Sequence, residues 1–167
     1  MTAMTVANSG FTANPLDILE EIVSANNWLF DRSSLDEMVV EVTGRWCDYR
    51  LFFFWHDEVG AMQFSSQFDM KVPEARRMAV WELLAIVNEK LWLGHFDLDS
   101  DDGSPMFRHT MLLRGAQGAS VEQLEDLVDV ALSECERFYP AFQFCVWADK
   151  TPAEAVSAAI LDTVAEA

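Results

Sequence analysis

The spacing of hydrophobic residues predicts an amphipathic helix near the start of the chain. Leu16, Leu19, Ile22 and Val23 recur at intervals of three and four, which places them on one face of a helix. Pro15 suits the first turn, and the side chain of the preceding Asn can accept a free backbone N–H. A helix of about three turns is expected, because Asn residues follow at 26 and 27.

The next part of the chain follows the period of β-strands. Apolar and polar residues alternate there, or apolar residues run without a break, in segments bounded by turn residues. The expected strands are 28–32, 38–43, 49–56 and 62–70. The run Leu51–Trp55 is apolar throughout, which is typical of a strand covered on both faces. In contrast, Gln63, Ser65 and Gln67 give the following strand one wet face. Short turns between the last three strands predict an antiparallel meander.

A second helix is predicted over 73–93. Pro73 suits its start, and Gly94 its end. Between Met78 and Val87 the segment has almost no polar face. A helix that is apolar all round must be covered on more than one side, so we expect the sheet on one side and another helix or a second subunit on the other.

The rest of the chain predicts two strands and two helices. His95–Leu98 and 106–114 are read as strands joined by an acidic turn. A capping box of Ser120 and Gln123 opens the longest amphipathic helix, in which Pro140 is expected to cause a kink or a restart. A similar box at 151–154 opens a last helix that ends at about 164.

Together these elements predict an α+β fold. It comprises an antiparallel sheet of about five strands with helices packed against it, in the order α-β-β-β-α-β-β-α-α. We expect a flexible N-terminus over 1–13 and a single domain over 14–167.

Composition narrows the classes of function. The 167 residues are 51% hydrophobic, which excludes a disordered chain. They carry 28 acidic residues against 11 Lys and Arg, a formal net charge of −17, so we expect no binding to nucleic acid. No segment is long and apolar enough to span a bilayer, no targeting signal is evident, and the three cysteines form no CxxC. These features predict a cytoplasmic protein with reduced thiols and no membrane insertion.

Candidate chemistry is sparse. The sequence has no nucleophile motif, no phosphate loop and no metal-binding spacing, so we predict neither an enzyme nor a cofactor. The segment 97–103 superficially resembles a calcium loop. However, it has Asp102 where such a loop needs Gly and Arg108 where it needs Glu, so a solvated hairpin turn is expected. His95 and His109 fall on adjacent predicted strands and are candidate ligand contacts.

The distribution of charge indicates where another molecule could approach. Residues 1–70 carry 11 acids and 3 bases, and residues 117–167 carry 10 and 2, whereas the middle segment 71–116 carries 7 and 6. Apolar patches with Arg and aromatic anchors are typical of interfaces. The alternative is that Trp81 and its neighbours are core residues. The candidate dimer or partner surface consists of Arg77, Val80, Trp81, Leu84, Arg108 and Arg114.

Three aromatic-rich segments resemble the bacterial YbjN-domain proteins. They are Asn88–Asp97, Phe107–Thr110 and Glu136–Phe144, and the resemblance extends over about 14–165. It implies a small α+β domain similar to type III secretion chaperones, commonly dimeric, in a family described as sensory transduction regulators. The family supplies no catalytic residues to carry over.

The leading hypothesis is a non-enzymatic module that binds a protein or peptide, with an adaptor-like or chaperone-like role that could extend to signal transduction. We expect a homodimer that uses the helix 73–93, with Trp81 near its centre. The alternative is a small-molecule or metal sensor that uses His95, Arg108 and His109.

Overall fold

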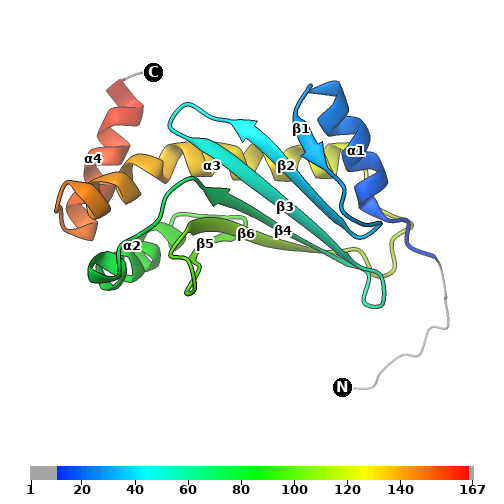
Figure 1. Cartoon of the computed structure of the whole chain (residues 1–167), viewed down its shortest axis with the longest axis horizontal. Helices are drawn as coiled ribbons and strands as arrows, with labels where there is room; N and C mark the ends of the chain where they lie inside the picture. Colours follow the sequence, from blue (N-terminus) through cyan, green and yellow to red (C-terminus); the bar gives the residue numbers. More distant parts are fainter. Residues whose placement is uncertain (1–10, 166–167) are drawn as a thin grey trace.

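A computed structural model describes residues 11–165 of the chain, with side chains described as far as Leu161. Within this range, one antiparallel sheet carries all the helices on the same face (Figure 1). The strand order is β1-β2-β3-β4-β6-β5. The strands are β1 (Leu29–Asp31), β2 (Glu37–Thr43), β3 (Asp48–His56), β4 (Ala61–Phe68), β5 (His95–Leu98) and β6 (Pro105–Leu112). The predicted α+β class is confirmed, with six strands rather than about five, and the short strand expected over 28–32 is the edge strand β1, paired with β2.

The helices form one layer behind the sheet. They are α1 (Pro15–Ala25), α2 (Arg77–Asn88), α3 (Val121–Trp147) and α4 (Pro152–Ala165), and a short 3₁₀ turn (Glu74–Arg76) precedes α2. The long α3 runs across the sheet, with α1 packed near its start and α2 and α4 near its end (Figure 1). Of the predicted flexible start, residues 1–10 lie outside the described residues. Ala13 donates its N–H to the carbonyl of Gln117 at 2.8 Å.

The hydrophobic core lies between the sheet and α3. Side chains alternate along a strand, so a row such as Val40, Leu51, Ser66 and Phe107 points to the helices from four neighbouring strands. All four are buried. Aromatic rings fill the space toward α2, and edge-to-face contacts such as Phe68–Phe142, with centroids 5.2 Å apart, join strand to helix.

The helix predicted over 73–93 is shorter in the structure. It ends at Asn88, before the glycine expected to stop it, because the Asn88 side chain bonds to the neighbouring strand. Its amide accepts from the N–H of Phe96 at 2.7 Å and donates to the Phe96 carbonyl at 3.0 Å. Gly94 has a positive φ of 64° and lies against the ring of Phe107, where a Cβ would clash. It therefore shapes the connection to β5 rather than the end of the helix.

Helix α3 is continuous from Val121 to Trp147, so the predicted restart at Pro140 does not occur. Proline forfeits one helical hydrogen bond and crowds the preceding turn. Here Pro140 lies in a stretch of α3, from Phe138 to Phe142, in which every residue is buried, and this burial in the core offsets the loss. Both predicted capping boxes are present, at Ser120 and at Thr151.

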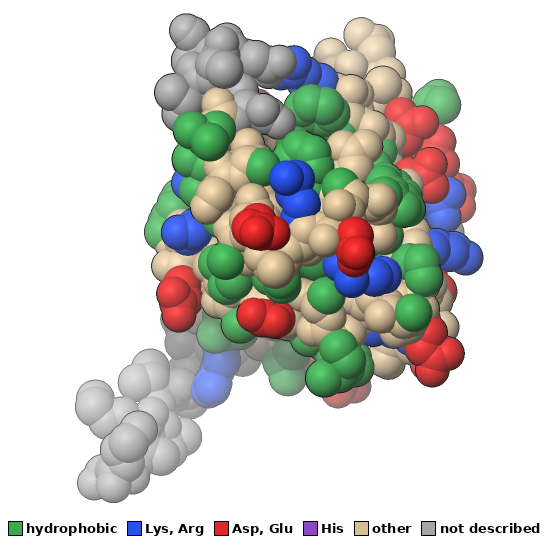
Figure 2. Space-filling model, turned by 90° about the vertical axis from the view of Figure 1, so that its left-hand side faces the viewer, with side chains coloured by type: hydrophobic (Ala, Val, Ile, Leu, Met, Phe, Trp, Pro, Cys, Tyr) green, Lys and Arg blue, Asp and Glu red, His purple; other side chains and the backbone are tan. Residues whose placement is uncertain are grey.

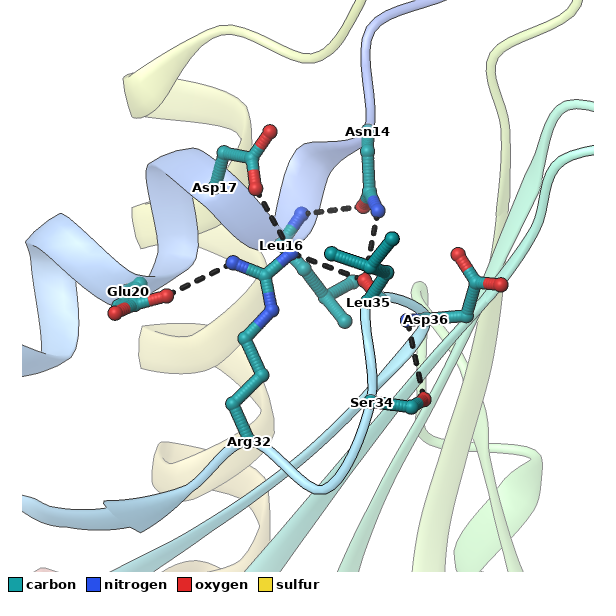
Figure 3. A network of polar contacts seen from close by, with 8 residues as sticks. All are labelled: Asn14, Leu16, Asp17, Glu20, Arg32, Ser34, Leu35 and Asp36. Carbon is teal, nitrogen blue, oxygen red and sulfur yellow. Dashed lines mark hydrogen bonds and ion pairs between the residues drawn. The ribbon is translucent and has the colours of Figure 1, made fainter.

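A polar network fastens α1 to the loop between β1 and β2 (Figure 3). Arg32 reaches Glu20 and Asp17 on α1 through two different nitrogens, each at 2.8 Å. It also donates to the carbonyl of Leu35 at 3.0 Å, and Asn14 donates to the same carbonyl at 2.8 Å. The side chain of Arg32 is only 17% exposed, so this guanidinium is the centre of the network.

Candidate functional site

The face of the sheet opposite the helices is uncovered in the part of the chain that the structure describes (Figure 1). Phe52 and Phe54 of β3 and Val39 of β2 point to this face. Each is half-buried by its neighbours in the sheet, and none belongs to the core or packs against it. The apolar run Leu51–Trp55 was expected to be covered on both faces, and only one is covered. A bare sheet face with aromatic side chains is therefore the candidate functional site.

The strand register builds a trough along β4 on this face. Ser65 lies opposite Phe52 on one side and Arg108 on the other. One step along, Gln63 lies between Phe54 and Thr110. The small Ser65 side chain makes the floor lowest at its middle, where the larger side chains of Phe52 and Arg108 form the walls. We call this feature, along Gln63, Ser65 and Gln67, the β4 trough.

Three neighbouring hollows make up the β4 trough. The largest, of about 450 Å³, lies between Phe52 and Phe54 on one wall and Arg108 on the other. A second, of about 350 Å³, shares Ser65 and Arg108 with the first. A third, of about 340 Å³, begins at Gln67 and extends to the ends of the strands. The first hollow lies at the Gln63 end of β4 and the third at the Gln67 end, whereas the second extends from Ser65 over β6 and β5.

Acidic side chains predominate around the trough. Its cations are partly neutralised, because Arg108 pairs with Asp97 at 3.0 Å and Arg50 pairs with Glu41 at 3.8 Å. The carboxylates that line the three hollows are Glu41, Asp48, Asp69, Asp97, Asp99 and Asp102, and the permanent cations are Arg50, Lys71 and Arg108. The trough therefore has an aromatic end near Phe54 and an acidic end beyond Gln67.

The predicted partner surface does not form one surface in the structure. Val80 is 0% exposed and Leu84 is also a core residue, so the expectation that they contact another chain is wrong. They face α3, α4 and β5, which cover the apolar middle of α2 within the same chain. Trp81, by contrast, is 49% exposed.

The three arginines of that predicted surface lie in different places. Arg77 donates to the carbonyl of Ser100 at 2.9 Å, beside the turn between β5 and β6. Arg108 lies on the open face of the sheet. Arg114 is exposed beyond the end of β6, close to Gly60 in the turn between β3 and β4.

The two candidate histidines lie on opposite faces of the sheet. His95 lies opposite Arg108 on the open face, whereas His109 lies opposite Phe64 on the helix side. Burial lowers the pKa of His109, and the nearby His95 lowers it further. No group of three His, Cys, Asp or Glu side chains suited to a metal occurs in the described part of the chain.

The acidic segment 97–103 forms the predicted hairpin turn. The carboxylate of Asp99 accepts the N–H groups of Asp101 and Asp102 at 2.8 and 3.1 Å. Asp102 accepts the N–H of Ser104 at 2.8 Å, and this bond lowers the pKa of the Asp102 carboxyl. The turn thus uses its carboxylates to hold its own backbone.

The thiols are unsuited to nucleophilic chemistry. Cys135 and Cys145 are buried, and Cys47 is half-buried. Burial raises the pKa of all three, which disfavours the reactive thiolate. Cys135 lies beside Ser66, with the sulfur and the hydroxyl oxygen 3.6 Å apart, as part of the core.

The sequence pointed to Arg108 and His95 on this face and missed Phe52, Phe54 and Ser65. A signal for them was present. The polar alternation at 63, 65 and 67 predicts a wet face on β4, and in an antiparallel sheet the neighbouring strands share that face. Phe52 and Phe54 must then lie on that face as well.

Comparison with known proteins identifies the family. Residues 15–144 match the model of the YbjN family, described as "Putative bacterial sensory transduction regulator". A similar solved structure is titled "Crystal structure of YbjN, a putative transcription regulator from E. coli". It is 14% identical, with a TM-score of 0.50, over 90% of this chain and 92% of that one, which shows a shared fold. No protein of curated function matches the chain.

The segments that carry the resemblance hold the fold together. The carboxylate of Glu136 accepts the N–H of Arg45 at 3.2 Å, which fastens the hairpin between β2 and β3 to α3. Phe96, Phe107 and Phe138 are buried in one aromatic cluster. No helix among the described residues has the length and hydropathy needed to cross a membrane. The match extends over most of the chain, and the chain belongs to the YbjN family.

Proposed function

We propose that this chain is a non-enzymatic regulatory domain that binds a protein or peptide on the open face of its sheet. The observation that carries the proposal is that Phe52 and Phe54, which the sheet buries only in part, line the β4 trough on a face that no described helix covers. Aromatic side chains in the middle of a sheet face are typical of a surface that another molecule covers. The proposal assigns an adaptor-like role, in which the chain acts through the partner that it holds.

The family description supports a regulatory role. The structure of the similar E. coli protein is titled that of "a putative transcription regulator". A chain with a net charge of −17 is poorly suited to the phosphate backbone of DNA, which requires neutralising Lys and Arg. We therefore propose that any regulation by this chain proceeds through contacts with proteins. A cytoplasmic location fits this role.

The polar groups of the open face favour binding over catalysis. Arg108 and Arg50 are engaged in ion pairs, and the carboxylates of the 97–103 turn bond to its backbone. Histidine and thiol groups lie apart from one another, without the mutual geometry that nucleophile and base require.

The experiment that tests the proposal is site-specific photo-crosslinking in cells that produce the protein. A photoreactive residue at position 54 is expected to capture a partner, and the same residue at position 121, which is exposed at the start of α3 away from both proposed contact surfaces, serves as the control. The captured protein is then purified and its affinity for the wild type and for Phe52→Thr is compared. The proposal is supported if capture is specific to position 54 and the variant binds at least about ten-fold more weakly. Capture at both positions alike, or at neither, contradicts it.

A second candidate function rests on the largest hollow, which is lined by His95, Arg108 and His109 together. We propose ligand sensing as the alternative, with Arg108 and His95 as the contacts because their side chains share the open face. A ligand-dependent rise in melting temperature that is lost in Arg108→Gln supports this alternative. No shift with any small molecule or metal contradicts it.

We also propose a homodimer through the exposed side of α2. Met78 is 73% exposed and Trp81 49%, and Trp92 after the helix is 77% exposed. Figure 2 shows the end of the molecule where α2 and α4 lie, with hydrophobic side chains interspersed among charged ones. A mixed surface of this kind fits a modest, reversible interface.

A further inference from the structure

We propose that the β4 trough binds an amphipathic helix of another protein, with aliphatic residues along one face and Lys or Arg beside them. This inference rests on the proposed function and names the chemistry of the partner. Four features of the trough support it: its width, its length, its lack of free backbone groups and its charge.

The dimensions of the trough match those of a helix. Its walls stand on β3 and β6, two strand spacings apart, which is about 10 Å. A helix with its side chains is about 10–12 Å across. Strand β4 has eight residues and is therefore about 26 Å long, the length of a helix of about 17 residues.

Backbone hydrogen bonding favours a helix over an extended segment. Strand β4 is paired on both sides, with β3 and with β6, so the floor of the trough offers no free N–H or C=O. An extended segment laid on it would find no backbone partners, whereas a helix satisfies its own. The nearby edge of the sheet is also occupied at Phe96, where the Asn88 amide takes both backbone groups.

The charges around the trough select a cationic partner. Six carboxylates line its hollows against three permanent cations, and the excess of three negative charges is unchanged by the two ion pairs, because each pair occupies one carboxylate and one cation. Lys and Arg on the partner would meet the acidic end beyond Gln67, and aliphatic side chains would cover Phe52 and Phe54. A second copy of this chain would bring the same carboxylates against each other, so the charges disfavour self-association through this face.

The test uses a fluorescent peptide of about 17 residues with Leu at helical spacing and Lys between, titrated with the full-length protein at about 0.15 M salt. Anisotropy is expected to show binding to the wild type and at least about ten-fold weaker binding to Phe54→Thr. Val121→Thr, which removes an exposed apolar side chain at the start of α3, is expected to bind as the wild type does. Neither substitution changes charge, so adsorption of a cationic peptide to an acidic protein would affect all three alike and would contradict the proposal.

Ser65→Gln keeps the test decisive if Phe54→Thr is poorly folded, because it adds an uncharged side chain to the floor without removing any packing. It too is expected to lower the affinity at least about ten-fold. Two further peptides test the chemistry: one with two central prolines, and one with Glu in place of Lys. If the proline peptide binds as tightly as the original, the helical part of the proposal is wrong. If the Glu peptide does so, the cationic part is wrong. A partner captured at position 54 that is neither helical nor cationic would overturn this inference and leave the proposed function intact.

Discussion

Asn88 is both the last residue of α2 and a hydrogen-bonding partner of the edge strand β5. Its amide satisfies the outward N–H and C=O of Phe96, which would otherwise be free to pair with another chain. One side chain thus ends the helix, fixes the distance between α2 and the sheet, and blocks one edge.

Removal of this amide is expected to destabilise the protein. In Asn88→Ala, two part-buried backbone groups of Phe96 lose their partners, so the free energy of unfolding should fall by about 2 kcal/mol. Urea denaturation measures this change. The exposed neighbour provides the control, because Glu89→Ala should change stability by less than about 0.5 kcal/mol. Equal stabilities of the two variants would show that the Asn88 bonds contribute nothing net.

His109 provides a pH-dependent term in stability. Its pKa is lowered in the folded protein, first by burial and then by His95, so the unfolded chain binds more protons below about pH 6.5. The stability that the neutral imidazole contributes is therefore lost as the pH falls through this range. We expect the wild type to lose more stability than His109→Gln between about pH 7.5 and about pH 5.5, as measured by urea denaturation at each pH. An equal or larger loss in the variant would contradict the assignment, since the carboxylates common to both proteins cancel in the comparison.

At the scale of elements, the sequence predicted the features that depend on residues close together in the chain. Hydrophobic period located every strand and helix, and the capping boxes at Ser120 and Thr151 were predicted by residue type alone. The ends that depend on other elements were not predictable. Asn88 ends α2 through a bond to β5, and Pro140 stays inside α3 because the core holds it. Neither partner is adjacent in sequence.

The candidate site was only partly predictable for a related reason. The apolar run Leu51–Trp55 has the pattern of a strand that is buried on both faces. No local rule reveals whether the second face is buried by the same chain or by another molecule. Likewise, the apolar helix around Val80 was expected to contact another molecule, although α3 and α4 cover it within the chain. The hydrophobic pattern of a segment indicates that a face is covered. Whether the cover is another part of the same chain or a second molecule depends on the tertiary fold.

The contact between α1 and the loop after β1 depends on a planar guanidinium. Arg32 reaches Glu20, Asp17 and Leu35 through two nitrogens, which a lysine cannot do. Arg32→Lys is expected to lower the free energy of unfolding by about 1–2 kcal/mol. Arg50→Lys is the matched control, because its exposed pair with Glu41 should contribute less than about 0.5 kcal/mol. If both variants unfold at the same urea concentration, the hydrogen bonds of Arg32 do not stabilise the contact between α1 and the loop after β1.

For the whole molecule, the two proposed contact surfaces differ in charge and in place. The open face is acidic and suits a cationic partner, whereas α2 is a neutral segment, with one base, Arg77, and one acid, Glu82. Self-repulsion of a chain with a net charge of −17 is smallest where that segment is exposed. One surface is therefore proposed for a different protein and the other for a second copy.

The dimer can be tested with a substitution that the structure makes specific. Val80→Glu would place a charge in the core and unfold the chain, so it says nothing about association. Trp81→Glu alters a half-exposed residue instead. We expect sedimentation velocity at tens of micromolar to show a dimer for the wild type and at least about ten-fold weaker association for Trp81→Glu, with an unchanged circular dichroism spectrum. Because like charges oppose association, the wild-type dimer should tighten as salt rises from about 0.02 M to about 0.3 M. A wild type that sediments as a monomer in both salts would overturn the dimer, and an unaffected Trp81→Glu dimer would place the interface elsewhere.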